Sequence, residues 1–331
     1  MKVSDVIGID VSKLTIDVRI HVDQRYGQFE NSKKGFDKMC HWVFKNNPTP
    51  KEEILFIFEH TGLYSYNLAV YLNRQGIPFH MAPGLEIKRS LGISRGKDDK
   101  IDATKIAKYA YRLRDEIIPY KLPSQELENL KRLFSLRNRL VKQRAGFKAS
   151  LKEQKRVYRV KDNTILLGVQ EKMIKYLTKQ INTIQEEIYG IIKSNDKLLK
   201  QYNLITSITS IGPQTALSMI VLTTGFTKFK NWRKFASFSG IAPFPHRSGT
   251  SIKGKTKVSH LANKKIKSLL NLCAINAIQY NLEMKLYYKR RSAEGKHPYS
   301  TINAIRNKLL ARIFAVVQRE QPYVNFLKFA A

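Results

Sequence analysis

The sequence has few cysteines, no long apolar run and far fewer acidic than basic residues. Only two cysteines occur among 331 residues, Cys40 and Cys273, and each stands in an apolar helical pattern. Isolated thiols of this kind indicate reduced side chains packed in cores, not a disulfide or a cysteine-bound metal. The seven histidines form no pair at zinc spacing, so a zinc site is not expected either.

No apolar run reaches the roughly 18 residues that a membrane-spanning helix needs. The first residues, MKVSDVIGIDVS, lack the basic and then apolar pattern of a secretion signal. We therefore expect a cytoplasmic protein with no membrane partner.

Acidic residues are scarce, with 26 Asp and Glu against 59 Lys and Arg, a formal net charge of +33. Residues 1–122 hold 20 basic and 15 acidic side chains, whereas residues 226–312 hold 19 basic and only 2 acidic ones. Such an excess requires a polyanionic partner. Because no amphipathic anchor or lipidation motif accompanies the charge, it favours nucleic acid over a membrane surface.

The N-terminal third alternates strand-like and helix-like segments. Three closely spaced β-rich segments, 6–12, 14–22 and 26–31, precede a series of helices and strands that ends near residue 113. This order predicts a mixed α/β sheet covered by helices, as in the RNase H fold.

Long helices follow Pro123. Residues 164–194 carry Ile and Leu at alternating steps of three and four, which predicts a coiled-coil hairpin with the preceding helix, 124–162, formed either within one chain or between chains. The remainder is mainly helical. We expect three domains: an α/β catalytic domain over 1–122, a helical hairpin over 123–196 that serves oligomerisation and nucleic-acid contact, and an all-α domain over 197–331.

Four carboxylates stand at positions where a metal site would need them. Asp10 lies within an apolar strand, Glu59 ends the strand ILFIFE, and Asp99 and Asp102 lie three residues apart on one helix. Hard oxygen ligands suit Mg²⁺ or Mn²⁺, and two such ions can assist phosphodiester transfer. Each residue also has a structural alternative: a turn for Asp10, a lysine partner for Glu59 and a helix cap for Asp99.

A serine lies in the most basic segment, PFPHRSGTSIKGKTK, which we expect to be an irregular loop between helices. Ser248 is surrounded there by cations that could screen a phosphate: Arg247, Lys253, Lys255 and Lys257. Phosphate binding alone would also explain this serine, and Ser251 and Ser239 are fallback nucleophiles. The segment GTSIKGKT matches a nucleotide-binding pattern, but the residues before it are Pro-rich and no Asp follows Asp196, so no nucleotide cofactor is expected.

Several motifs together resemble one family. GIDVSK (8–13), FEHTG (58–62), KDDKIDATKIAKYA (97–110), SITSIGPQTA and FASFSGIAP (235–243) resemble the Asp-Glu-Asp-Asp insertion-sequence transposases of the one-ten family, related to the Piv and MooV DNA invertases. The resemblance covers nearly the whole chain and extends through a tail that contains AIRNKLLARIF. Asp98, Ser210 and Ala262 depart from the family pattern, which more often has Thr, Gly and Gly there.

This resemblance implies a transposase or site-specific recombinase with a RuvC-like N-terminal domain, in which Asp10, Glu59, Asp99 and Asp102 bind the metal. It implies that Ser248 attacks DNA and forms a phosphoserine link, that a bridge-type RNA guides the protein to donor and target DNA, and that dimers assemble into tetramers. Such a protein would associate with the nucleoid of a bacterium or archaeon. Two alternatives stay open: a RuvC-like nuclease that uses water, and a non-catalytic RNA- or DNA-binding protein.

Further basic residues are candidates for nucleic-acid contact. Beside the cations around Ser248, they are Lys264, Lys265, Lys289, Arg290 and Arg291. The last three follow Tyr287 and Tyr288, whose rings could stack on bases or be buried in the protein.

Overall fold

A computed structural model describes residues 2–90, 99–248 and 252–325. The chain divides into two compact units, Met1–Leu122 and Pro123–Ala331. Within the described ranges, no helix is both long and apolar enough to cross a membrane.

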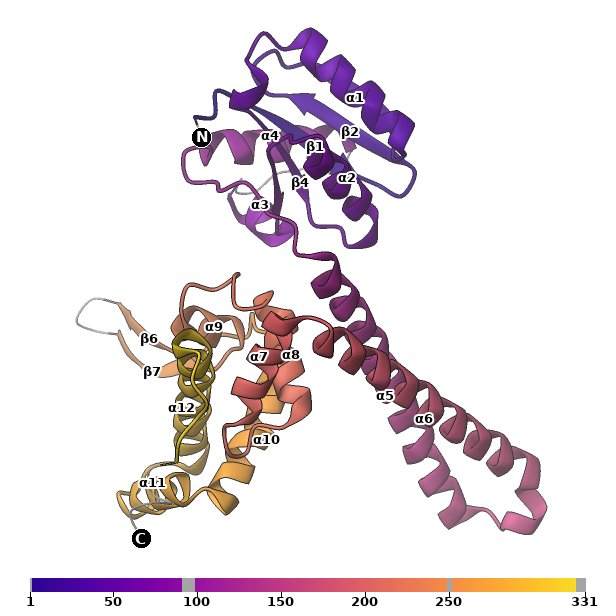
Figure 1. Cartoon of the computed structure of the whole chain (residues 1–331), viewed down its shortest axis with the longest axis vertical. Coiled ribbons are helices and arrows are strands. Elements are labelled where there is room, and N and C mark those ends of the chain that lie inside the picture. The colour runs from indigo at the N-terminus through magenta and orange to yellow at the C-terminus, as the bar shows by residue number, and fades with distance from the viewer. Residues whose placement is uncertain (1, 91–98, 249–251, 326–331) are drawn as a thin grey trace. The chain divides into compact units, whose positions relative to one another are not determined.

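Unit 1 is built on one mixed sheet. Its strands are β1 (Asp5–Val11), β2 (Thr15–Ile20), β3 (Tyr26–Glu30), β4 (Ile54–Glu59) and β5 (Phe79–Ala82), in the order β3-β2-β1-β4-β5. The first three pair antiparallel, and β1, β4 and β5 pair parallel (Figure 1). The expected mixed α/β sheet is therefore present.

Helices cover both faces of this sheet. The core on one face joins the strands to α1 (Lys33–Asn46) and α2 (Leu63–Arg74), and the core on the other joins them to α3 (Gly84–Ser90) and α4 (Asp99–Arg112). A short 3-10 turn, Lys51–Glu53, precedes β4. Because both faces are covered, β4 is apolar at every position before Glu59.

The contact of α4 with β1 depends on a glycine. A Cβ atom at Gly8 would lie 2.4 Å from the Ala107 nitrogen and 2.5 Å from the Ala103 oxygen. The backbones of helix and strand therefore touch at a distance that no side chain permits.

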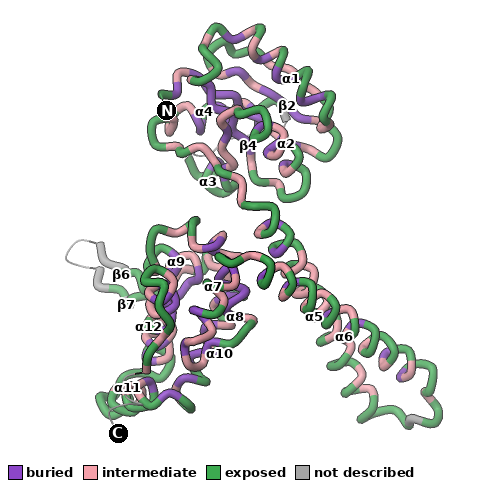
Figure 2. Tube along the Cα trace, viewed as in Figure 1, coloured by how far each residue is buried: buried purple, intermediate pink, exposed green. Residues whose placement is uncertain are grey.

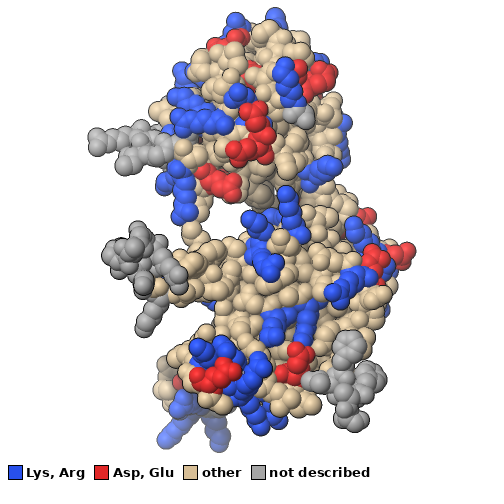
Figure 3. Space-filling model, turned by 90° about the vertical axis from the view of Figure 1, so that its left-hand side faces the viewer, with Lys and Arg blue, Asp and Glu red and all other residues tan. Residues whose placement is uncertain are grey.

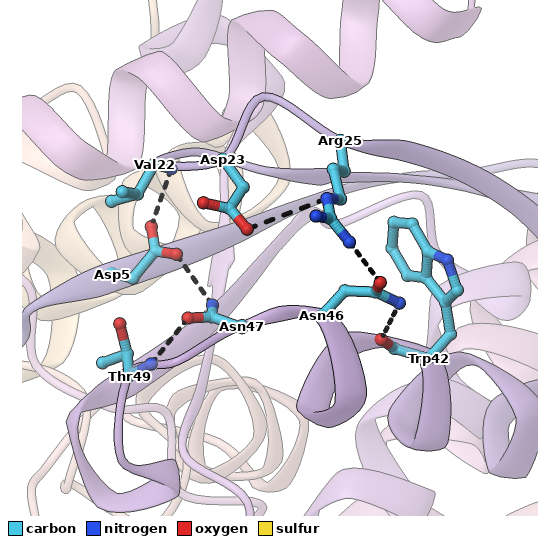
Figure 4. A network of polar contacts seen from close by, with 8 residues as sticks. All are labelled: Asp5, Val22, Asp23, Arg25, Trp42, Asn46, Asn47 and Thr49. Carbon is cyan, nitrogen blue, oxygen red and sulfur yellow. Dashed lines mark hydrogen bonds and ion pairs between the residues drawn. The ribbon is translucent and has the colours of Figure 1, made fainter.

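A buried carboxylate joins β1 to the segments that flank it. Asp5 is fully buried, and its oxygens accept a hydrogen bond from the backbone nitrogen of Val6. They also accept from the backbone nitrogen of Val22 and from Nδ2 of Asn47 (Figure 4). Burial raises the pKa of Asp5, while these donors act in the opposite direction. The network ties the start of β1 to the chain after β2 and after α1.

Unit 2 begins with two long helices. α5 (Gln125–Val157) and α6 (Thr164–Lys193), joined through a 3-10 turn at Val160–Asn163, lie side by side in one chain (Figure 1). Leu177, Ile181 and Ile188 are buried on the seam. The expected hairpin is thus intramolecular, while its far end is largely exposed (Figure 2).

The rest of unit 2 is a helical bundle with one core. Its helices are α7 (Asp196–Thr206), α8 (Pro213–Thr223), α9 (Trp232–Phe238), α10 (Lys264–Tyr280), α11 (Leu282–Ala293) and α12 (Pro298–Arg319). Ser210 precedes α8 with φ 77°, a conformation that favours glycine. Cys273 lies in this core and Cys40 in unit 1, both as free buried thiols whose pKa burial raises, to about 11 for Cys40.

The expectation of an irregular loop around Ser248 was wrong. Residues Pro243–Ser248 (β6) and Ile252–Val258 (β7) form an antiparallel hairpin with an irregularity between Phe244 and His246. Its Thr and Val residues lie in β7, and the two arms pair from Pro243–Val258 to Ser248–Ile252. The Pro, Gly and Lys residues of this segment had indicated a loop, because strand pairing leaves only a weak pattern in so polar a sequence.

The Asp5 network generates a stability prediction. Asp5→Ala leaves three donors without their acceptor, two of them buried, and should lower the free energy of unfolding by about 2–4 kcal/mol, measured by urea denaturation. Asp23→Ala is the matched control, because it removes only the 3.8 Å surface ion pair with Arg25, which contributes less than about 1 kcal/mol. Equal losses in the two variants would contradict the role given to Asp5.

Candidate active site

Two of the four predicted carboxylates lie at the same edge of the sheet. Ile9 pairs with Phe58 in the parallel register of β1 and β4, so Asp10 and Glu59 follow at adjacent positions. Val6 and Gly8 face α4, as do Leu55 and Ile57 of β4. Because side chains alternate along a strand, Asp10 and Glu59 lie on this same face, at the carboxyl ends of their strands.

Helix α4 brings the other two positions to this edge. Tyr111, near its C-terminus, stacks on His21, whose backbone nitrogen bonds to Val6 at the start of β1. Ala103 and Ala107 lie over Gly8 in the middle of β1. The helix therefore runs antiparallel to β1, and its N-terminal turn approaches the end where Asp10 lies.

Asp102 belongs to that turn. It precedes Ile106 by four residues, and Ile106 belongs to the core between α4 and the sheet, so Asp102 lies on the side of α4 that faces the sheet. Its Oδ1 atom accepts a 2.8 Å hydrogen bond from the ammonium of Lys105. Asp99 is the first residue of α4, but its side chain, like the whole of Asp98, lies outside the described part of the structure.

The Glu59 carboxylate rests on the backbone of α3. A Cβ atom at Gly84, the first residue of α3, would lie 2.1 Å from Glu59 Oε1. Glycine at this position therefore leaves space for the carboxylate. Glu59 also pairs with Ala82 in the register of β4 and β5, which fixes its backbone at the sheet edge.

A fifth carboxylate, Asp17, was missed by the sequence analysis. It lies directly opposite Asp10 in the antiparallel register of β1 and β2 and is 1% exposed. Its Oδ1 atom accepts hydrogen bonds from Tyr26 and from Gln28 at 3.0 Å, whereas Oδ2 is buried without a partner. The alternation of TIDVRI, with a charge inside an apolar strand, was the signal that could have found it.

The donor set suits a hard divalent cation, but the ligands are not gathered into a cluster. Asp10, Glu59 and Asp102 offer only oxygen atoms, and they converge on one sheet edge. Among residues 2–90, 99–248 and 252–325, however, no three His, Cys, Asp or Glu side chains come close enough to hold a metal. Asp102 bonds to Lys105 instead, so a cation would have to displace that lysine.

The hairpin of β6 and β7 in unit 2, called the serine hairpin because β6 ends at Ser248, is held at its base by hydrogen bonds and close packing. The Asn263 nitrogen donates to the Phe238 oxygen at 2.9 Å, and a Cβ at Gly240 would lie 2.4 Å from Cβ of Ala262. Nδ2 of Asn303 and of Asn307, both on α12, donates to the Ile241 oxygen at 2.8 and 3.1 Å. The residues leading into β6 are therefore bonded to α10 and α12.

Ser248 is the last residue of β6. Its side chain lies outside the described part of the structure, as do the side chains of Arg247, Lys253 and Lys255. Ser251 lies outside them entirely. Ser239 is fully buried and donates its hydroxyl to the Ala236 oxygen at 3.1 Å. This fallback candidate is therefore inaccessible to a DNA strand in the described conformation.

The other predicted basic contacts differ in their availability. Lys257, Lys264, Lys265 and Lys289 are exposed, while Arg290 and Arg291 both pair with Glu294, at 3.8 and 2.5 Å. Tyr287 is half-buried, and the cations of Lys308 and Arg290 lie 4.8 and 5.6 Å from its ring centre. On the face drawn in Figure 3, Lys and Arg side chains are spread widely and acidic ones are fewer.

Known proteins are similar to the chain in sequence over both units. Residues 7–155 match a family model for transposases of the IS110 type, and residues 202–289 match the transposase family IS116/IS110/IS902. The chain is 27% identical over 324 residues to the pilin gene-inverting proteins of Moraxella lacunata and Moraxella bovis, which covers 96% of this chain and 97% of theirs.

A shorter similarity links the chain to the uncharacterized 43.6 kDa protein of insertion element IS110 from Streptomyces coelicolor. The two are 24% identical over 154 residues, 46% of this chain and 38% of that protein. The two family matches together include the serine hairpin of unit 2 and the carboxylate face of unit 1, which consists of Asp10, Glu59 and Asp102. The chain belongs to the IS110 family of transposases and recombinases, which is related to the pilin gene-inverting proteins.

Proposed function

We propose that this DNA transposase or recombinase cleaves and rejoins DNA through a phosphoserine intermediate, with unit 1 acting as a RuvC-like catalytic domain of the RNase H type. The observation that supports the proposal best is the pair Asp10 and Glu59, on one face at the carboxyl ends of adjacent parallel strands. The strand order β3-β2-β1-β4-β5, with three antiparallel strands first, supports the fold assignment.

Asp10, Glu59, Asp99 and Asp102 are the proposed ligands of Mg²⁺ or Mn²⁺. A bound pair of such ions would stabilise the charge that develops on the attacking and leaving oxygens of the phosphodiester. Asp102 would have to leave its ion pair with Lys105 to hold such a cation. In the absence of the cation, the Lys105 ammonium limits repulsion between the carboxylates.

Ser248 is the proposed nucleophile. Its Oγ atom forms a bond to phosphorus, the bond from phosphorus to one deoxyribose oxygen breaks, and the serine proton leaves with a base while the departing sugar oxygen gains one. Attack of a deoxyribose hydroxyl on the phosphoserine reverses these bonds and joins the strands without an external energy source. The basic residues near Ser248, among them Arg247, Lys253, Lys255 and Lys257, would neutralise the phosphate.

The proposed partners are donor and target DNA and a bridge-type guide RNA, with the chain acting as a dimer or tetramer. The excess of cations in residues 226–312 supports a second polyanion beside DNA. A guide of this kind would also explain how site choice can reside outside the protein. The exposed end of the α5 and α6 hairpin is a surface available to other subunits.

The serine step makes a direct prediction. With Mg²⁺ and its element's DNA, the protein should form a covalent protein–DNA adduct, detected by denaturing electrophoresis, and Ser248→Ala should abolish it. Ser251→Ala is the matched control and should retain the adduct. Strand cleavage that persists in Ser248→Ala would identify water as the nucleophile and a RuvC-like nuclease instead.

The carboxylate face makes a second prediction. Asp10→Asn and Glu59→Gln should reduce adduct formation at least a hundredfold while DNA affinity stays within about twofold, because they remove metal ligands and no phosphate contact. Gly84→Ala should lower adduct formation as well, since the new methyl group displaces the Glu59 carboxylate. Gly168→Ala, a position with open space on α6, is the control. Unchanged activity in all three site variants would favour a non-catalytic DNA- or RNA-binding protein.

A guide RNA makes the third prediction. Protein purified from cells that carry its complete element should retain one RNA species, and sequencing should show segments complementary to both donor and target DNA. An RNA population that mirrors the cell's total RNA would contradict guidance and indicate non-specific binding by the basic surface.

A further inference from the structure

Helix α12 carries a half-buried arginine that lacks a carboxylate partner. Arg306 donates from Nη1 to Oδ1 of Asn303 at 3.3 Å and from Nη2 to Oδ1 of Asn271 on α10. Its Nε atom is buried without a hydrogen-bond partner, and no ion pair joins Arg306 to any acidic residue of the described ranges. The guanidinium therefore keeps its full positive charge beside neutral amides.

This arrangement costs folding free energy. Burial lowers the pKa of Arg306, and no neighbouring acid opposes that effect. Arg312, on the same helix, is paired with an acid instead: both carboxylate oxygens of Glu283 accept hydrogen bonds from its Nη2 atom. A desolvated cation with no counterion among the described residues is expected where a ligand supplies the anion.

The amides that hold Arg306 also hold the serine hairpin. Asn303 accepts from Arg306 with Oδ1 and donates with Nδ2 to the Ile241 oxygen, two residues before β6 begins. Asn307, one turn further along α12, donates to the same oxygen. The Asn303 side chain thus connects the Arg306 guanidinium to the base of the serine hairpin.

We propose that Arg306 binds a DNA backbone phosphate at the base of the serine hairpin, and that Asn271 and Asn303 orient its guanidinium for that contact. The inference rests on the proposed action of the hairpin on DNA. A guanidinium has five N–H donors, of which the two amides use two, so one N–H on each Nη atom remains for phosphate oxygens. Phosphate contact would then also stabilise the hairpin base through Asn303.

The test measures binding without chemistry. Fluorescence anisotropy titrations of a duplex DNA are made in EDTA, with the Ser248→Ala protein as the background, at several salt concentrations. Arg306→Gln should weaken binding about tenfold and reduce the slope of log affinity against log salt by about one. Arg319→Gln, an exposed residue at the end of the same helix, removes the same charge and should change affinity less than twofold.

Two further measurements separate the outcomes. Thermal unfolding of Arg306→Gln should be unchanged or higher, because a buried unpaired charge is removed. A lower melting temperature with unchanged affinity and slope would overturn the proposal and give Arg306 a structural role. A duplex RNA of the same sequence is titrated in parallel, and a loss of affinity confined to RNA would overturn the assignment to DNA. Because neither metal nor serine chemistry takes part, failure of the recombination mechanism leaves these results unaffected.

Discussion

The contact between Gly8 of β1 and the backbone of α4 is the constraint on which the arrangement of the carboxylates in unit 1 depends. Since no side chain separates helix and strand there, the backbone of α4 lies directly against the sheet. Stacking of the Tyr111 ring on His21 at the other end of the helix fixes its direction. Its N-terminal turn then has to approach the edge at which β1 and β4 end. Carboxylates that are some ninety positions apart in sequence share one face for this reason.

Much of unit 1 could be predicted because its signals are local. Alternating and continuous apolar segments identified all five strands, and the apolar strand interrupted by Asp10 and ended by Glu59 indicated where ligands would lie. The pairing of Asp10 with Asp17 was not predictable in the same way, because it depends on the register of β1 against β2. The short helix α3 and its Gly84 were also missed, and their effect on Glu59 arises only from tertiary contact.

In unit 2 the sequence analysis located the helices but misread the segment around Ser248. Its Pro, Gly and Lys residues predicted an irregular loop, whereas β6 and β7 pair, and the hairpin base is held by Asn303 and Asn307 from sixty residues downstream. Contacts of such long range leave no periodic pattern. They nevertheless fix the backbone that leads into β6, because Asn303 and Asn307 hold the Ile241 oxygen.

The central claim is that the edge formed by Asp10, Glu59 and the first turn of α4 binds divalent cations. The most direct measurement is anomalous diffraction from crystals of the Ser248→Ala protein with duplex DNA and Mn²⁺. The account predicts manganese peaks between the Asp10 and Glu59 carboxylates, with Asp102 released from Lys105. Ordered DNA with the Asp102–Lys105 ion pair intact and no manganese at this edge would contradict it.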